Sequence, residues 1–166
     1  DFQERDEDAE VLGIDTSDID DDYPVQEVST GLPAVVVPLE NLDAVRRVSL
    51  DRDAYDDFVS ESDAKLLHVF APETYEDEND LNARMFAPYY GVPEDPATGS
   101  ANGCLGAYLV EQGYLEPSDV DVRVEQWYEV ERPSLVRVRA SDDGNDESID
   151  VRVGGKVEKV AEGELV

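Results

Sequence analysis

Residues 91–103 (GVPEDPATGSANG) place a carboxylate, a proline, two small hydroxyl residues and glycines at the start of a predicted helix. Asp95 is predicted to be its N-cap, because its side chain can accept from the free N–H groups of the first turn, and Pro96 suits the first helical position. A helix N-terminus carries about half a positive charge and attracts phosphates or carboxylates. Three residues would line such an anion site: Thr98, Gly99 and Ser100. The alternative is a capped core helix that holds no ligand.

The helix that begins here is predicted to run from Ala97 to Gln112 and to end at Gly113. Apolar or small side chains cover most of its circumference, which is typical of a helix that is buried nearly all round. Glycines stand at positions 99, 103 and 106, although each interior glycine costs a helix about 1 kcal/mol relative to alanine. They indicate that neighbouring backbone approaches the helix closely, as it would around a central helix wrapped by a sheet.

Apolar stretches on both sides of this helix predict strands, several of which alternate like half-exposed antiparallel strands. The expected strands are 25–28, 34–38, 65–70, 82–87, 120–128, 135–140, 148–153 and 156–160. Helices are expected at 41–48 and 52–60 and, in a short form, around 6–12, and Gly154-Gly155 is expected to form a tight hairpin. The predicted fold class is therefore mixed α/β (α+β), with a strand-rich sheet wrapped around a central buried helix.

Several motifs together resemble those of one family. Residues 94–101 (EDPATGSA), preceded by RMFAP at 84–88, are similar to the signature of the phenazine-biosynthesis (PhzF-like) isomerases, which have the diaminopimelate-epimerase-like fold. Further matches in the family's order and approximate spacing are VSTGLP (28–33), VVVPL (35–39), FAPET (70–74), EQ (125–126), RPS (132–134) and AEGEL (161–165). The resemblance implies a protein built from two similar lobes.

The resemblance also implies proton transfer without a cofactor or metal. In such proteins a helix start from each lobe faces a shared cleft, and the two hold a substrate carboxylate while an acid/base group moves a proton between carbons. Gly99 and Ser100 would bind the carboxylate of a small substrate through an amide and a hydroxyl. Asp95 would be a catalytic residue that orients a substrate amine or the partner acid, a role compatible with N-capping. Thr98 stands where diaminopimelate epimerases have a nucleophilic cysteine, and its hydroxyl is too weak an acid for two-thiol racemisation.

Five further residues each have two interpretations. Thr30 and Gly31 could bind substrate in the same cleft or simply form a strand turn. Arg84 could hold a substrate carboxylate bidentately or form a salt bridge to a nearby acidic residue. Cys104 is expected to be a small core residue rather than a catalytic thiol. His68, the single histidine, is expected to be structural, because the family's acting histidine belongs to the other lobe.

The chain departs from the family's pattern in two ways. Trp127 and Glu131 stand where the family usually has glycine, so the loop or strand edge there is expected to differ. The Gly-Asn-Pro motif that carries the acid/base glutamate belongs to the first lobe and does not occur in this sequence. Residues 25–166 are therefore expected to be the C-terminal lobe, which would be inactive in isolation. Residues 1–24 are acidic and are expected to be the connector between the lobes. The expected partners are the N-terminal lobe and, since homodimers are common in the family, a second copy.

The charge balance is the second distinctive property. Forty-two acidic residues face thirteen basic ones, giving a net charge of −29, and carboxylates recur in almost every segment. Such self-repulsion destabilises a compact state at low ionic strength and is screened by salt, which favours a halophile's high-salt cytoplasm. The sequence has no basic patch for nucleic acid and no long apolar run for a membrane, and its single cysteine excludes an intrachain disulfide. The expected localisation is cytoplasmic.

The alternative to an isomerase is a non-catalytic domain that binds anions or a partner.

Overall fold

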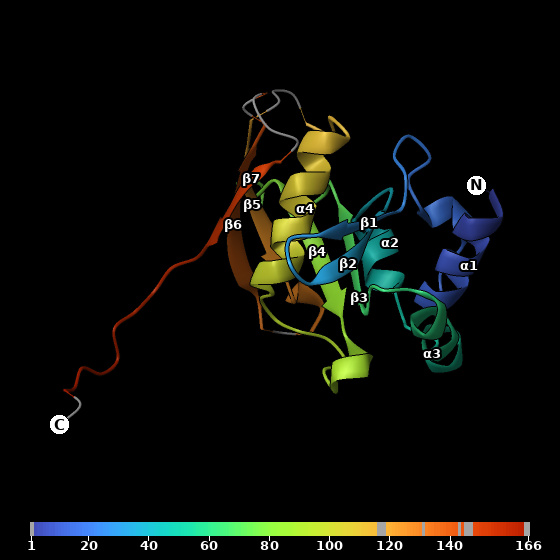
Figure 1. Cartoon of the computed structure of the whole chain (residues 1–166), viewed down its shortest axis with the longest axis horizontal. Coiled ribbons are helices and arrows are strands. Elements are labelled where there is room, and N and C mark those ends of the chain that lie inside the picture. The colour runs from blue at the N-terminus through green and yellow to red at the C-terminus, as the bar shows by residue number, and fades with distance from the viewer. Residues whose placement is uncertain (1, 116–118, 131, 143, 145–147, 165–166) are drawn as a thin grey trace.

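A computed structural model describes residues 2–115, 119–130, 132–142, 144 and 148–164 (Figure 1); Glu131 lies outside these ranges. Seven strands form one sheet whose spatial order follows the sequence. They are β1 (Gln26–Ser29), β2 (Pro33–Pro38), β3 (Leu66–Ala71), β4 (Leu81–Phe86), β5 (Val120–Gln126), β6 (Ser134–Ser141) and β7 (Asp150–Gly154). The α-helices are α1 (Phe2–Leu12), α2 (Leu42–Arg47), α3 (Arg52–Glu61) and α4 (Gly99–Glu111), and short 3-10 turns are η1 (Thr16–Asp18), η2 (Pro88–Tyr90) and η3 (Tyr128–Val130).

The connections explain how helices come to cover both faces of the sheet. The pairs β2–β3 and β4–β5 are parallel and the other four pairs are antiparallel. A parallel pair needs a crossover, and here α2 with α3 forms the first crossover and α4 the second. α4 contacts both edge strands, β1 and β7, as well as β2, β3, β5 and β6. The sheet therefore curls around α4 (Figure 1), which confirms the predicted fold class.

The two faces of the sheet have separate apolar cores. One core joins α4 to strand residues such as Val36, Phe70 and Val124, and the other joins α1, α2 and α3 to residues such as Val37 and Val69. β3 and β4 are buried at every position because both of their faces are covered. β6 alternates between buried and exposed residues, because α4 covers one face while solvent meets the other.

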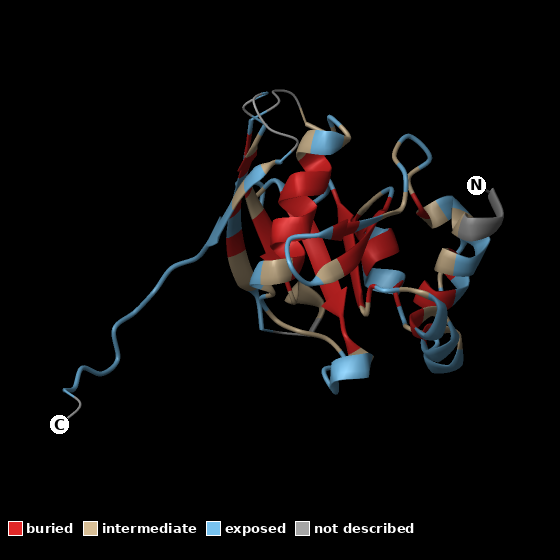
Figure 2. Ribbon diagram, viewed as in Figure 1, coloured by how far each residue is buried: buried red, intermediate tan, exposed pale blue. Residues whose placement is uncertain are grey.

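The central helix is buried as the sequence predicts. Each residue from Ala101 to Leu109 is buried (Figure 2). The prediction that neighbouring backbone packs closely against the glycines of this helix is wrong, because the atoms close to Gly103 and Gly106 belong to side chains. A Cβ added at Gly106 would lie 2.6 Å from Val138 Cγ1, and one at Gly103 would lie 3.3 Å from Thr30 Oγ1, whereas one at Gly99 would meet nothing within 4 Å. Inward-pointing side chains of the curled sheet occupy the space that these glycines leave.

Three predicted features differ from the structure, one at the end of β5 and two after β7. β5 ends at Gln126 because Trp127, which follows it, adopts a left-handed backbone conformation with φ of 65°. Residues 155–164 have no regular secondary structure, so the predicted hairpin at Gly154-Gly155 and strand at 156–160 are wrong. Val157 and Val160 are three positions apart and would face opposite sides of a strand, so the segment lacks one apolar face to bury.

None of the helices in the described ranges is long and apolar enough to cross a membrane.

Candidate functional site

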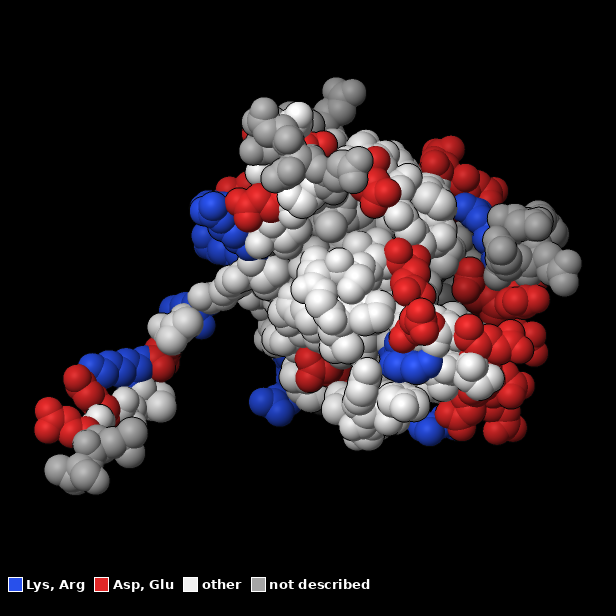
Figure 3. All heavy atoms as spheres, viewed as in Figure 1, with Lys and Arg blue, Asp and Glu red and all other residues white. Residues whose placement is uncertain are grey.

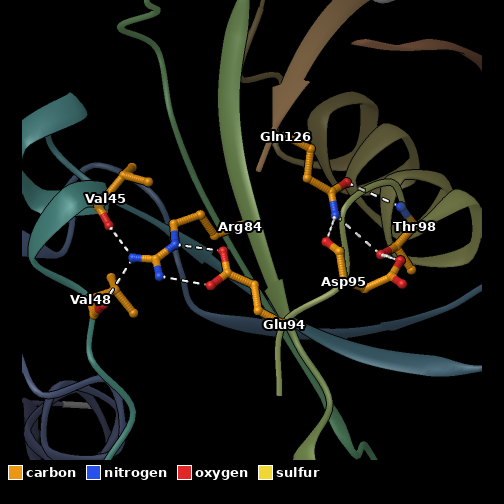
Figure 4. Close-up of polar contacts among 7 residues, drawn as sticks. All are labelled: Val45, Val48, Arg84, Glu94, Asp95, Thr98 and Gln126. Carbon is orange, nitrogen blue, oxygen red and sulfur yellow. Dashed lines mark hydrogen bonds and ion pairs between the residues drawn. The ribbon is translucent and has the colours of Figure 1, made fainter. Parts of the chain in front are cut away.

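The candidate site lies where β4 and β5 end and α4 begins. The segment between η2 and α4 is held to β4 by a hydrogen bond of 3.0 Å from the Asp95 N–H to the Met85 carbonyl. Glu94 and Asp95 then point in opposite directions, Glu94 towards Arg84 and Asp95 towards Thr98 (Figure 4). Two adjacent carboxylates are thereby separated, one on the α2 side of the sheet and the other on the α4 side.

Thr98, rather than Asp95, is the N-cap of α4. The helix begins at Gly99, so the prediction of Asp95 as N-cap, Pro96 as first helical residue and a start at Ala97 was wrong. The reason is tertiary, because Gln126 of β5 bonds both the Asp95 carbonyl and the Thr98 N–H and holds this turn outside the helix. The Asp95 side chain instead accepts a hydrogen bond from the Thr98 hydroxyl.

The first turn of α4 is left open. The Thr98 side chain does not cap the helix, and no backbone hydrogen bond within the described residues occupies the N–H groups of Gly99, Ser100 or Ala101. Gly99 is exposed and Ser100 is half-buried, so this end of the helix lies at the surface of the chain. Uncapped amides at the positive end of a 13-residue helix favour a carboxylate or phosphate.

Two buried amide side chains complete the site, and neither was predicted from the sequence to belong to it. Gln126 and Asn102 are both fully buried, and the Asn102 Nδ2 donates to Gln126 Oε1 at 2.8 Å and to the Thr98 carbonyl at 2.9 Å. Asn102 is one of the few strongly polar residues of an otherwise apolar helix, and this polarity is the sequence signal for it. Gln126 belongs to the Glu-Gln pair that contributes to the family resemblance, but its partners lie near residue 95 and no local pattern predicts them.

Arg84 lies on the opposite face of the sheet from Asp95. Its Nε and Nη2 donate to the two carboxylate oxygens of Glu94 at 2.8 and 2.9 Å, and its Nη1 donates to the carbonyls of Val45 and Val48 at the end of α2. Arg84 is 8% exposed, and its guanidinium lies at the negative end of the short helix α2. Of its two interpretations, the structure therefore contains the salt bridge, and the candidate anion site does not include Arg84.

Thr30 and Gly31 form an exposed turn that packs beside α4, one turn beyond its start. Thr30 Oγ1 lies 3.6 Å from the sulfur of Cys104, whose thiol is also 3.6 Å from the Leu32 carbonyl. Gly31 adopts φ of 120°, a conformation that favours glycine. Cys104 is fully buried within the α4 core, which confirms its expected packing role.

Two other buried ionisable residues lie outside this constellation. His68 of β3 is fully buried between Val36 and Met85 on the neighbouring strands, and burial lowers its pKa from 6.5 to about 4. The Glu125 carboxylate accepts four hydrogen bonds, from the backbone of Tyr75 and Glu76 and from two asparagine side chains, so it holds a loop. No group of three or more His, Cys, Asp or Glu residues in the described ranges is arranged to hold a metal ion.

Comparisons with known proteins agree with this architecture. The family model described as phenazine biosynthesis-like protein (PhzC-PhzF) matches residues 2–163. The chain is 32% identical over 137 residues to an uncharacterised isomerase of Bacillus subtilis, covering 82% of this chain and 46% of that protein. It is 34% identical over 136 residues to the trans-2,3-dihydro-3-hydroxyanthranilate isomerase of Pseudomonas fluorescens, covering 80% and 44% respectively. A PhzF-family crystal structure from Bacillus anthracis has a TM-score of 0.81 at 29% identity, covering 91% of this chain and 51% of that one.

The chain thus spans about half the length of these relatives. The family match extends across nearly the whole sequence and includes the open helix start, the Asp95 segment and the Glu-Gln pair. This chain belongs to the phenazine biosynthesis-like (PhzC-PhzF) protein family.

Proposed function

We propose that this chain is the C-terminal half of a PhzF-like isomerase that moves a proton between carbon atoms of a small carboxylate substrate without a cofactor. The observation that carries the proposal is the uncapped start of α4 beside Asp95, in a chain whose relatives are named isomerases. The open amides of Gly99 and Ser100 suit the substrate carboxylate. Thr98 occupies Oδ2 of Asp95, so Oδ1 would accept from a substrate amine or from the partner acid.

The other half of the proposed site comes from an upstream lobe. The chain covers about half of each relative, and this sequence lacks the glutamate motif that the family resemblance implies. A cleft formed between two lobes would exclude water and bring the acid/base group opposite Asp95. The turn at Thr30 and Gly31 would then border the cleft from the second turn of α4. The isolated chain is expected to bind the carboxylate weakly and to be catalytically inactive.

Deuterium exchange tests the proposal. The complete product of the native gene would be incubated in D2O with EDTA and trans-2,3-dihydro-3-hydroxyanthranilate, followed by other small amino carboxylates, and mass spectrometry would measure deuterium at carbon. We expect exchange with at least one compound. We expect Asp95→Asn to slow it by at least about 100-fold, because the acid/base group of the other lobe contributes that much only when it is positioned, and Asp95 would orient it or the substrate amine.

The matched control is Asp53→Asn, an exposed aspartate in the first turn of α3 on the other face of the sheet, which should exchange at the wild-type rate. The isolated 166-residue chain should exchange nothing. If the complete protein catalysed no exchange but bound carboxylates at α4, the non-catalytic anion-binding domain would be the correct function.

A further inference from the structure

We propose that Gln126 is a positioning residue of this site, which acts through Thr98 to orient Asp95 and to keep the start of α4 open. The inference rests on the proposed function, since it concerns the same anion site. It adds to the site a residue from strand β5. It also explains why Thr98, although it occupies the N-cap position of α4, makes no capping hydrogen bond with its side chain.

The contacts of Gln126 all converge on the site. Its Nε2 donates to the Asp95 carbonyl at 2.7 Å and to Thr98 Oγ1 at 3.2 Å (Figure 4). Its Oε1 accepts from the Thr98 N–H at 3.2 Å and from Asn102 Nδ2 at 2.8 Å. A primary amide offers two donors and two acceptor positions, so all four are used, and all four partners belong to residues 95–102.

The orientation of this amide is fixed by the backbone. Oε1 faces a backbone N–H, which can only donate, and Nε2 faces a backbone carbonyl, which can only accept. A rotated amide would place two donors against each other on one side and two acceptors on the other. Because Gln126 is also fully buried, no bulk water is available to replace the bonds to the Thr98 N–H and the Asp95 carbonyl that a rotated amide would lose.

This orientation sets the direction of the Thr98 hydroxyl. Since Nε2 donates to Thr98 Oγ1, the single hydroxyl proton is directed to Oδ2 of Asp95. Threonine at an N-cap normally turns its oxygen towards the free N–H groups of the first turn. Here that oxygen is held between Gln126 and Asp95, so the amides of Gly99 and Ser100 stay available for a ligand anion.

Loss of the Gln126 amide should therefore close the site from within. Without the bond to Nε2, only the bond to Asp95 still holds the Thr98 hydroxyl, so its oxygen can turn towards the first turn of α4, where it would compete with any external anion. A purely structural glutamine would behave differently, because its removal would lower the stability of the fold but leave the affinity for anions unchanged.

The experiment measures sulfate binding to the 15N-labelled chain by NMR at constant potassium chloride concentration, following the amides of Gly99 and Ser100. Gln126→Met keeps the side-chain length and removes all four bonds, while Gln126→Glu keeps the acceptor oxygen and removes both N–H donors. The matched control is Gln112→Met, which removes an amide that bonds Gln26 at the other end of α4. Thermal unfolding of every variant is recorded in parallel.

We expect wild-type sulfate binding to be weakened at least about fivefold by Gln126→Met, the effect of about one hydrogen bond, and more by Gln126→Glu. Gln112→Met should lower the thermal midpoint but keep the wild-type affinity. In a Thr98→Val background, which cannot cap α4 with a hydroxyl, Gln126→Met should have a smaller effect on affinity.

Wild-type affinity in both Gln126 variants, or a full effect in the Thr98→Val background, would overturn the positioning role while leaving the site intact. Failure of the proposed site has a different signature: the wild-type amides would not respond to sulfate, or Ser100→Ala would bind it as tightly as the wild type. That result would overturn the positioning role as well, because no anion site would remain to be positioned.

Discussion

At the scale of single residues, the site depends on where neighbouring side chains are directed. Glu94 and Asp95 are adjacent carboxylates, yet Glu94 forms a largely buried bidentate pair with Arg84 while Asp95 receives the Thr98 hydroxyl. The ion pair neutralises Glu94 and anchors the segment to β4 and to the end of α2. Asp95 is thereby left as the carboxylate next to the open helix start, which suits it for the proposed catalytic role.

His68 provides a prediction at the same scale. Its folded pKa of about 4 lies below the ordinary 6.5, so the unfolded chain binds a proton between these values that the folded chain does not. The stability contribution of neutral His68 is therefore complete above pH 6.5 and is lost as the pH falls towards 4. Between pH 7 and pH 5 the loss should be on the order of 2 kcal/mol.

Urea unfolding of the wild type and His68→Leu at pH 7, 6 and 5 checks this prediction. Leucine is close in size to histidine and suits the apolar surroundings of Val36 and Met85. The difference between the two unfolding free energies cancels the titration of the many carboxylates that both proteins share. We expect the variant to gain stability relative to the wild type as the pH falls, and a constant difference would refute the assignment.

At the scale of elements, local patterns predicted most of the fold and the tertiary contacts decided the rest. Alternation and apolar runs located β1 to β7 and α1 to α4, because these periodicities reflect which faces are covered. The start of α4 was placed two residues early, since Gln126 holds the preceding turn from a distant strand. The Asp95–Ser100 segment was recognised from sequence, but the partner of Arg84 required knowing which face of β4 it occupies.

The packing of α4 inside the curled sheet gives a prediction for this scale. Gly106→Ala would place a methyl group 2.6 Å from Cγ1 of Val138, a fully buried β-branched residue with little freedom to move. Overpacking should cost about 1–3 kcal/mol, which outweighs the roughly 1 kcal/mol gained from higher helix propensity. Urea unfolding should show a net loss of stability.

Gly99→Ala is the matched control for this substitution. Both glycines belong to α4, but an added Cβ at Gly99 meets nothing within 4 Å. The control should keep or slightly raise the unfolding free energy. If Gly106→Ala were as stable as Gly99→Ala, close packing of β6 on α4 could not be the reason for glycine at position 106.

At the scale of the whole molecule, acidic side chains gather around α1 and α3, while the face over β1 and α4 is mostly uncharged (Figure 3). Exposed acidic residues from both helices border one groove on that side, among them Glu7, Glu10, Asp57 and Glu61. Like charges across a groove repel, and the net charge of −29 leaves few cations to balance them. We propose that this surface is adapted to a high-salt cytoplasm, where ions screen the repulsion between α1 and α3.

The dependence of stability on salt tests this adaptation. The Debye length falls from about 10 Å at 0.1 M to about 3 Å at 1 M salt, so molar potassium chloride should screen charges across the groove. The thermal midpoint is therefore expected to rise markedly between these concentrations. A variant with Glu7→Gln, Glu10→Gln and Glu61→Gln should be more stable than the wild type at 0.1 M and should respond less to added salt. A wild-type midpoint that does not change with potassium chloride would contradict the high-salt origin, and an equal response in the variant would place the repulsion elsewhere on the surface.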